Sequence, residues 1–392
     1  MGDRLALDGG EPVRREALPL HRPAFDEAEV QAAAEVIRSG HVAGNGPVSR
    51  DLERMFREYL GARHALLTTS GTAALELALR AWGLELGDEV ICPSFTFPST
   101  ANAILLAGGR PVFADIDPDT WNLDPERVRA AITPRTRAIL PVHYAGQPCA
   151  LDELFGIARP LGIPIVADAA HALGARYGGR PVGAVENVAC FSLHQTKNLT
   201  CGEGGLLTTN DDRVAQAAEI VREKGTDRAA FLRGEVACYT WVALGSSYVL
   251  SDVLAAIARE QLKKIDWITQ RRARCAAFLL DELRPLADRL QLPTVRPECE
   301  SSWHVFAVLV PASLRDWFIR ALRAEGIGAA FHFVPLHSSP FGKHLFGGHS
   351  PDLPVTENVG ARLVRLPLYP QLTEEDLADI VRAVTKVARA LP

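Results

Sequence analysis

The sequence predicts an α/β protein whose main domain is a mostly parallel sheet covered by helices on both faces. Between about residues 64 and 210, seven short apolar runs alternate with stretches of helical spacing. These runs are apolar throughout, which is typical of strands that are buried on both faces. After residue 262 the alternation ends, and long helical stretches surround one strand-like run. We therefore expect a large domain over 1–261 and a smaller α+β domain over 262–392.

Two helices are expected before the sheet begins. Residues 26–40 have helical spacing with Val30, Ala33, Ala34 and Ile37 on one face, and 49–61 forms a second helix that ends at a glycine. The predicted strands are 64–69, 89–93, 110–116, 136–144, 163–170, 188–193 and 205–210. The C-terminal part is expected to contain helices at 252–266, 267–286, 313–325 and 373–390, a strand at 304–311 and a His- and Pro-rich loop at 332–354.

Composition excludes several classes of protein. Hydrophobic residues make up 47% and charged residues 23% of the 392 residues, which excludes a disordered chain and a coiled-coil rod. The net charge is -5 with no run of like charges, so we expect no nucleic-acid partner. No segment approaches the ~20 apolar residues of a membrane span, and the seven cysteines are scattered. We expect a cytoplasmic protein with reduced thiols and no membrane contact.

Polar residues follow three of the predicted strands, where open α/β sheets bind their ligands. One predicted strand is followed by a turn into a helix, and this turn contains Ser70, Gly71 and Thr72. The free amides and the dipole at the start of the helix favour binding of a phosphate. The alternative is an ordinary N-cap, since serine is a preferred capping residue. Asp168 follows a second apolar run, where a buried carboxylate needs a partner. That partner is a protein arginine, a helix cap, a metal or a protonated pyridine ring.

The third strand end carries Lys197, in the segment SLHQTKNLTCGEGG. The chain has six lysines, and the other five stand in charged or exposed-looking surroundings. Desolvation at such a site lowers the pKa of an amine and makes it a nucleophile, whereas the alternative is a solvated loop lysine. We identify Lys197 as the candidate Schiff-base residue.

Together these residues meet the requirements of pyridoxal phosphate. That cofactor needs an amine for its aldehyde, an acid opposite its ring nitrogen, an anion site for its phosphate and a surface for its ring. Phe95 and Phe97 follow another strand and supply that surface, unless both belong to the core. The four histidines between 332 and 349 have no regular ligand spacing, so we expect no metal site.

The segments SGTAAL, PSFTFPSTANAILLAGGRPVFADIDPDTWNLDP, DAAHALGA and FSLHQTKNLTCGEGG occur in this order. They resemble the sugar-nucleotide aminotransferases of the DegT/DnrJ/EryC1/StrS family, from about residue 20 to the C-terminus. The resemblance implies the aspartate-aminotransferase type of fold (fold type I of the pyridoxal-phosphate enzymes) and a homodimer with active sites at the subunit interface.

The resemblance also assigns a role to each motif residue. Lys197 holds the cofactor aldehyde, and Asp168 pairs with the pyridine nitrogen. Gly71, Thr72 and Ser192 hold the phosphate, next to Ser70, and Phe97 covers the ring. His171 stands where the family usually has Gln, near the ring hydroxyl.

Residues 222–252 and 331–347 resemble one subgroup more closely. That subgroup aminates C4 of dTDP-4-keto-6-deoxy-D-glucose, with L-glutamate as amino donor. It shares the sequence Gly-Ser-Ser-Tyr at 245–248, so Ser247 is expected to reach the partner's phosphate. Tyr239, His332 and His337 lie in these segments and are candidate substrate contacts.

Three alternatives remain open. The first is a 3-aminotransferase acting on a dTDP-3-keto sugar, and the second is a relative that binds a sugar nucleotide without catalysis. The third is a dehydratase, but such relatives are expected to carry His in place of Lys197.

Overall fold

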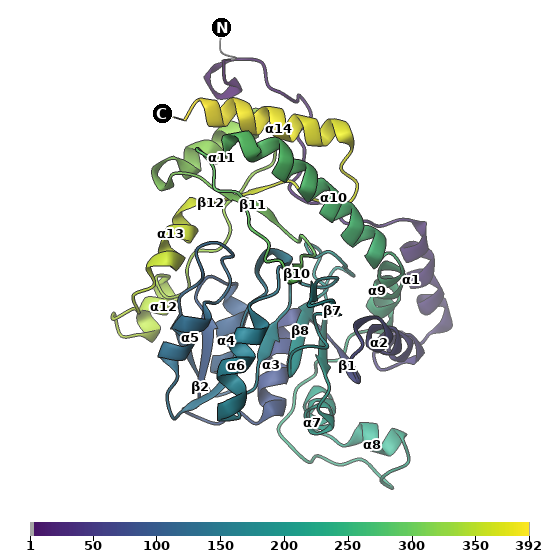
Figure 1. Cartoon of the computed structure of the whole chain (residues 1–392). Helices are drawn as coiled ribbons and strands as arrows, with labels where there is room; N and C mark the ends of the chain where they lie inside the picture. The colour runs from purple at the N-terminus through teal and green to yellow at the C-terminus, as the bar shows by residue number, and fades with distance from the viewer. Residues whose placement is uncertain (1–3, 392) are drawn as a thin grey trace.

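The computed structural model describes residues 4–391, and its centre is the α/β sheet that the sequence predicts (Figure 1). One sheet has the strand order β1-β9-β8-β5 and another the order β3-β2-β4. Parallel bridges from Ile139 to Ile165 and from Val142 to Asp168 join β4 to β5. The bounds are β1 His64–Thr68, β2 Glu89–Pro93, β3 Arg110–Ala114, β4 Thr136–Ile139, β5 Val166–Asp168, β8 Val188–Ser192 and β9 Gly205–Thr209.

Helices cover both faces of this sheet, as expected. Along β8, Val188 and Cys190 point into one core, whereas Ala189 and Phe191 point into the other. The first core contains α3 Gly71–Trp82, α4 Pro98–Leu106 and α7 Asp212–Arg222. The opposite face is covered by α2 Pro47–Leu60, α5 Pro125–Ala131, α6 Leu151–Ala158 and α9 Asp252–Lys263. The uniformly apolar strand sequences follow from this burial on both sides.

The C-terminal part forms a second core, drawn at the top of Figure 1. Its helices pack around the antiparallel pair β11 and β12. The bounds are α10 Ile265–Leu283, β11 Phe306–Leu309, α11 Arg315–Ala324, β12 Leu363–Leu366 and α14 Glu374–Arg389. Ile265 still belongs to a core of the sheet and Leu283 to the second core, so α10 connects the two. A domain boundary near residue 262 remains our proposal.

The first described residues pack against this C-terminal part. Leu5 and Leu18 belong to its core. The amides of Ala6 and Val13 donate to the carboxylate of Glu325 at 2.8 and 3.1 Å. The first described residues and α14 therefore lie together on the C-terminal part (Figure 1).

Several elements differ from the sequence expectations. β9 runs antiparallel to both of its neighbours. The predicted loop at 332–354 contains the short helix α12 Pro340–Leu345 and is followed by α13 Pro354–Arg362. Short elements not expected from the sequence are α8 Arg228–Leu232, β6 Arg176–Tyr177, β7 Arg180–Pro181 and β10 Cys299–Glu300.

The expected apolar face of the first helix, α1 Glu27–Ser39, is wrong in part. Val30 and Ile37 are exposed, and the helix instead packs through Ala32 and Val36 against Ala256 of α9. Ala32 and Val36 are four residues apart and share one face of the helix, whereas Val30 and Ile37 lie on the opposite face.

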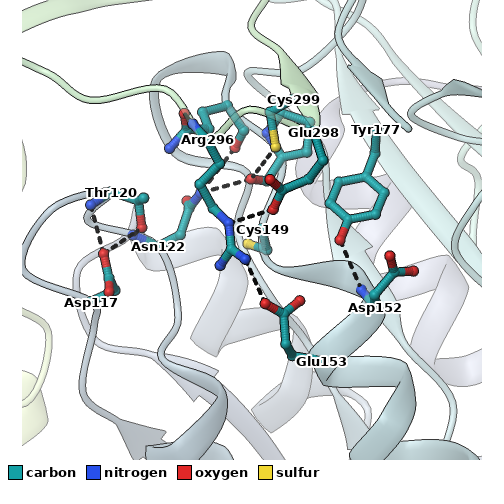
Figure 2. A network of polar contacts seen from close by, with 12 residues as sticks. Asp117, Thr120, Asn122, Cys149, Asp152, Glu153, Tyr177, Arg296, Glu298 and Cys299 are labelled. Carbon is teal, nitrogen blue, oxygen red and sulfur yellow. Dashed lines mark hydrogen bonds and ion pairs between the residues drawn. The ribbon is translucent and has the colours of Figure 1, made fainter. Parts of the chain in front are cut away.

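A polar network fixes the segment before β11 onto the large domain (Figure 2). Arg296 donates from its side chain to Glu153 and Glu298, and its amide donates to Gln147 Oε1 at 3.1 Å. Asn122 donates to the carbonyls of Gln147 and Pro148, both at 3.1 Å. The chain that continues toward His304 thus starts from a fixed position. No helix within residues 4–391 combines the length and apolar character needed to cross a membrane.

Candidate active site

A cavity of about 1020 Å³ lies where the ends of the sheet strands meet the C-terminal part. It brings together most of the residues that the sequence singles out. Those lining it are Ser70, Gly71, Thr72, Phe97, Asp168, His171, Ser192, Lys197 and His332.

The N-terminus of α3 forms an anion cradle on one side of the cavity. Ser70 caps the helix by accepting the amide hydrogen of Ala73 at 3.0 Å. Among residues 4–391, no acceptor is bonded to the amides of Gly71 and Thr72, which therefore remain free for a ligand. A Cβ at Gly71 would lie 2.8 Å from the Cβ of Ser192, so only glycine fits between the helix and β8. The free backbone amides, the nearby serine and threonine hydroxyls and the positive end of the α3 dipole together favour binding of a phosphate.

Asp168 ends β5 and is buried, and each of its carboxylate oxygens has a donor. Thr100 donates its hydroxyl to Oδ2 at 2.7 Å, and the amide of Ala170 donates to Oδ1 at 3.1 Å. Burial raises the pKa of Asp168, while these hydrogen bonds and the charge of Lys197 oppose that rise. A protonated ring nitrogen in the cavity would stabilise the charged carboxylate in the same way.

Lys197 lies in a turn that its own amide closes by donating to His194 O at 2.8 Å. The turn follows β8 and places the side chain in the cavity wall. Burial lowers the pKa of Lys197 to about 8, against the opposing charge of Asp168. A sizeable fraction of the amine is therefore neutral near pH 8, which is the form that attacks an aldehyde.

His171 carries a buried ring nitrogen with no partner. Its Nδ1 is inaccessible and makes no hydrogen bond in the described chain. Burial lowers the pKa of His171 well below its usual value, so the ring is neutral. The His304 ring packs against it at a centroid distance of 4.3 Å. Nε2, the other ring nitrogen, is not among the buried atoms and makes no hydrogen bond within residues 4–391, so it is the atom that a ligand oxygen in the cavity would meet.

The structure also brings in residues that sequence analysis missed. Thr100, Tyr144, His304 and Arg365 all lie at the cavity or directly behind it. The hydroxyl of the fully buried Tyr144 lies 2.8 Å from His332 Nδ1. Threonine and tyrosine in apolar segments resemble core residues, so only the spacing of Thr100 one helical turn after Thr96 hinted at a polar face.

Backbone strain is concentrated around Tyr144. Ala145, Trp303 and Phe333 have φ values of 57°, 50° and 53°. The amide of His304 donates to the Ala145 carbonyl at 2.9 Å, so the strained segments at Ala145 and Trp303 are bonded to each other. Non-glycine residues adopt this left-handed conformation only where the surroundings impose it. The wall that carries His304 and His332 is thus fixed by its backbone.

Three predicted contacts lie outside the cavity of their own chain. His337 is buried behind the wall, with Nδ1 2.7 Å from Ser94 Oγ and Nε2 3.0 Å from Glu357. Both ring nitrogens are occupied, so the geometry gives His337 a bracing position rather than a substrate contact. Tyr239 is exposed, and the backbone of Ser247 forms an isolated antiparallel β-bridge with that of Glu223.

Comparison with known proteins identifies the family. The model of the DegT/DnrJ/EryC1/StrS aminotransferase family matches residues 23–385. The chain belongs to this family. It is 36% identical to the spore coat polysaccharide biosynthesis protein SpsC of Bacillus subtilis over 384 residues, covering 96% of this chain and 98% of that protein.

Solved structures share the fold. DesV from S. venezuelae, in complex with a ketimine intermediate, superimposes with a TM-score of 0.88 at 34% identity, covering 96% of this chain and all of DesV (100%). NtdA from Bacillus subtilis, with bound cofactor PMP, gives a TM-score of 0.84 at 27% identity over 93% of this chain and 82% of NtdA. The DegT/DnrJ/EryC1/StrS protein described here is therefore a pyridoxal-phosphate-dependent sugar aminotransferase of fold type I.

Proposed function

We propose that this aminotransferase moves an amino group from L-glutamate to C4 of a nucleotide-linked 4-keto-6-deoxy sugar. The expected substrate is dTDP-4-keto-6-deoxy-D-glucose, and the product is the dTDP-linked 4-amino-4,6-dideoxy sugar. One observation carries the catalytic part of the proposal. A single cavity holds an amine of lowered pKa and a buried carboxylate, beside a helix N-terminus with free amides.

The residues of the cavity fit pyridoxal phosphate. We assign the phosphate to the amides of Gly71 and Thr72 and the hydroxyl of Ser192, with Ser70 holding the helix start. Asp168 would pair with the ring nitrogen, His171 would donate to or accept from the ring hydroxyl, and Phe97 would cover one face of the ring. When bound, the cofactor supplies an aldehyde carbon and a ring that accepts electrons.

Lys197 has two tasks in this scheme. Its amine would hold the cofactor aldehyde, and once released it would act as the base and acid that takes a proton from the substrate carbon and returns one. A pKa of about 8 suits both directions, because such a group accepts and donates a proton near neutral pH. An ionised Asp168 would keep the ring nitrogen protonated, so that the ring could accept electrons.

The substrate assignment rests on segments 222–252 and 331–347 and on the cavity wall that the second segment forms. His332 lines the cavity and is fixed by the Tyr144 hydroxyl, so a free ring nitrogen faces the ligand side. Phe331, Val334 and Phe341 add exposed apolar surface at the same wall. A deoxy sugar with a methyl group and few hydroxyls fits such a wall.

A second copy of the chain is expected to complete the site. The segment 228–248 projects from the body near α7 and α8 (Figure 1). It exposes Leu232, Tyr239, Trp241 and Leu244. Exposed apolar clusters of this kind are typical of subunit contacts. In a homodimer, this segment would carry Ser247 and Tyr239 to the neighbouring cavity.

An assay with defined sugars tests the proposal. The purified enzyme is incubated with glutamate and either a 4-keto or a 3-keto dTDP-6-deoxy sugar, and the amino sugar is identified by NMR. We expect amination at C4. Amination of the 3-keto sugar alone would establish the 3-aminotransferase alternative. Binding of both sugars without any amino product, in enzyme that carries the cofactor, would establish the non-catalytic one.

A further inference from the structure

His304 is held at three points, yet one of its ring nitrogens has no partner in the described chain. Its amide donates to the Ala145 carbonyl at 2.9 Å, and its own carbonyl accepts from the buried guanidinium of Arg272 at 3.3 Å. Its Nδ1 lies 3.1 Å from Asn198 Oδ1. Within residues 4–391, its Nε2 makes no hydrogen bond and is not among the buried atoms. Because His304 lines the cavity, this nitrogen is open to a ligand.

Asn198 fixes the tautomer of the His304 ring. The Nδ2 of Asn198 donates to the Ser302 carbonyl at 2.8 Å, which leaves Oδ1 on the side of His304. An amide oxygen only accepts, so His304 Nδ1 carries a hydrogen and donates it. Burial lowers the pKa of His304 well below its usual value, and the charges of Lys197 and Arg272 act in the same direction, so the ring is neutral. The free nitrogen, Nε2, is therefore a hydrogen-bond acceptor and not a donor.

This acceptor lies beside the reacting centre. Asn198, which holds the ring, directly follows Lys197 in the chain, and the charge of Lys197 acts on His304. The ring of His171, another residue of the cavity lining, packs against His304 at a centroid distance of 4.3 Å. A donor that meets Nε2 therefore belongs to the part of a substrate next to the carbon that exchanges its proton with Lys197.

A keto sugar has one hydroxyl donor directly beside its reacting carbon. In the 4-keto-6-deoxy sugar of the proposed function, C3 bears a hydroxyl, whereas C5, on the other side of the ketone, bears the methyl group. The ketone oxygen cannot donate, and the diphosphate is attached to C1, on the far side of the ring. We propose that His304 Nε2 accepts a hydrogen bond from the hydroxyl next to the ketone and so selects sugars that retain it. An acceptor fixed in advance discriminates strongly, because a sugar without the hydroxyl leaves it unpaired. The inference rests on the proposed function, since it assumes a keto sugar.

A sugar that lacks this hydroxyl tests the contact directly. Single turnovers of the aminated holoenzyme are measured with the 4-keto-6-deoxy sugar nucleotide and with its 3-deoxy analogue. We expect the wild type to use the analogue roughly 5- to 100-fold less efficiently, the range for an unpaired acceptor. His304→Phe keeps a ring but removes both nitrogens, so its two efficiencies should agree within about threefold. His304→Gln can restore an acceptor and should regain part of the preference. His41→Phe changes an exposed histidine outside the cavity lining and should behave as the wild type.

Each other outcome has a definite meaning. Equal efficiencies of the wild type with both sugars would overturn the contact, and this result needs no variant. A preference that persists undiminished in H304F would assign the hydroxyl to another group. A lower cofactor affinity or a shifted absorbance maximum in H304F, with the preference intact, would assign Nε2 to the cofactor instead. If the wild type aminates neither sugar, the proposed function fails, and calorimetric binding of the two sugars still measures the contact. Unchanged melting temperatures show that the variants are folded.

Discussion

The two walls of the cavity are built differently. On the sheet side, Asp168 is held by Thr100 and Ala170 and the start of α3 by Ser70, while the amides of Gly71 and Thr72 remain free for the phosphate of the cofactor. On the C-terminal side, Arg365 makes no ion pair or side-chain hydrogen bond with residues 4–391, and Phe331 and Val334 are exposed. The free groups of the first wall are those that the cofactor would bind, whereas those of the second remain for a substrate. We infer that the sheet wall fixes the cofactor and that the C-terminal wall selects the substrates.

The largest effect is expected from Lys197→Ala on the sheet wall. Removing the amine should lower the rate of both half-reactions by at least 10²- to 10⁴-fold, because a general acid and base is lost. Single-turnover absorbance measures this. Lys263→Ala is the matched control, since Lys263 is exposed and pairs only with Glu260 on its own helix. Substantial transamination by the Lys197 variant would remove Lys197 from the mechanism.

Cofactor uptake by the apo-enzyme should depend on pH through the same residue. The neutral amine reacts, so a pKa of about 8 predicts that the rate rises roughly 50-fold from pH 6 to pH 8 and then levels off. In the folded apo-enzyme the pKa of Lys197 lies below that of an ordinary lysine, so between about pH 8 and pH 10.5 the unfolded chain binds more protons than the folded one. The free energy of unfolding of the apo-enzyme should therefore rise with pH in this range. A rise in uptake centred near pH 10.5 would show that Lys197 is not desolvated.

Thr100→Val should weaken cofactor binding roughly 10- to 100-fold. The variant keeps the shape of the side chain but removes the hydrogen bond to Asp168 Oδ2, which is worth about 1.5–3 kcal/mol for a charged acceptor. Equilibrium dialysis of the cofactor measures the change, and Thr100→Ser should restore most of it. If the serine variant is as weak as the valine variant, the hydroxyl does not position the carboxylate.

His332→Gln is expected to have the smallest effect. It is also the most direct test of whether the two walls have different functions. Loss of one hydrogen bond, about 1 kcal/mol, should raise KM for the sugar roughly fivefold and leave cofactor affinity unchanged. Steady-state kinetics and dialysis on the same preparation measure both quantities. A drop in cofactor affinity equal to the rise in KM would mean that the C-terminal wall binds the cofactor as well as the substrate.

The sheet, its coverage by helices and the residues at its strand ends could be predicted because they depend on local patterns. Asp168 and Lys197 each follow an apolar run, and such positions meet at one edge of the sheet. The reversed direction of β9 could not be predicted, since its pairing with β1 and β8 depends on the tertiary path. Arg365 was missed for a similar reason: an arginine in a short strand is ordinary, and only the assembled structure shows that no acid of residues 4–391 lies within ion-pair distance of it.

The docking of Leu5 and Leu18 into the C-terminal core has a consequence for biosynthesis. Glu325, which receives the amides of Ala6 and Val13, leaves the ribosome more than three hundred residues after them. At a translation rate of about 5–20 residues per second, Glu325 is synthesised roughly 15–65 s after Ala6 and Val13. The sheet can therefore fold first. The C-terminal core is completed last, when the N-terminal segment with Leu5 and Leu18, which was synthesised first, packs into it.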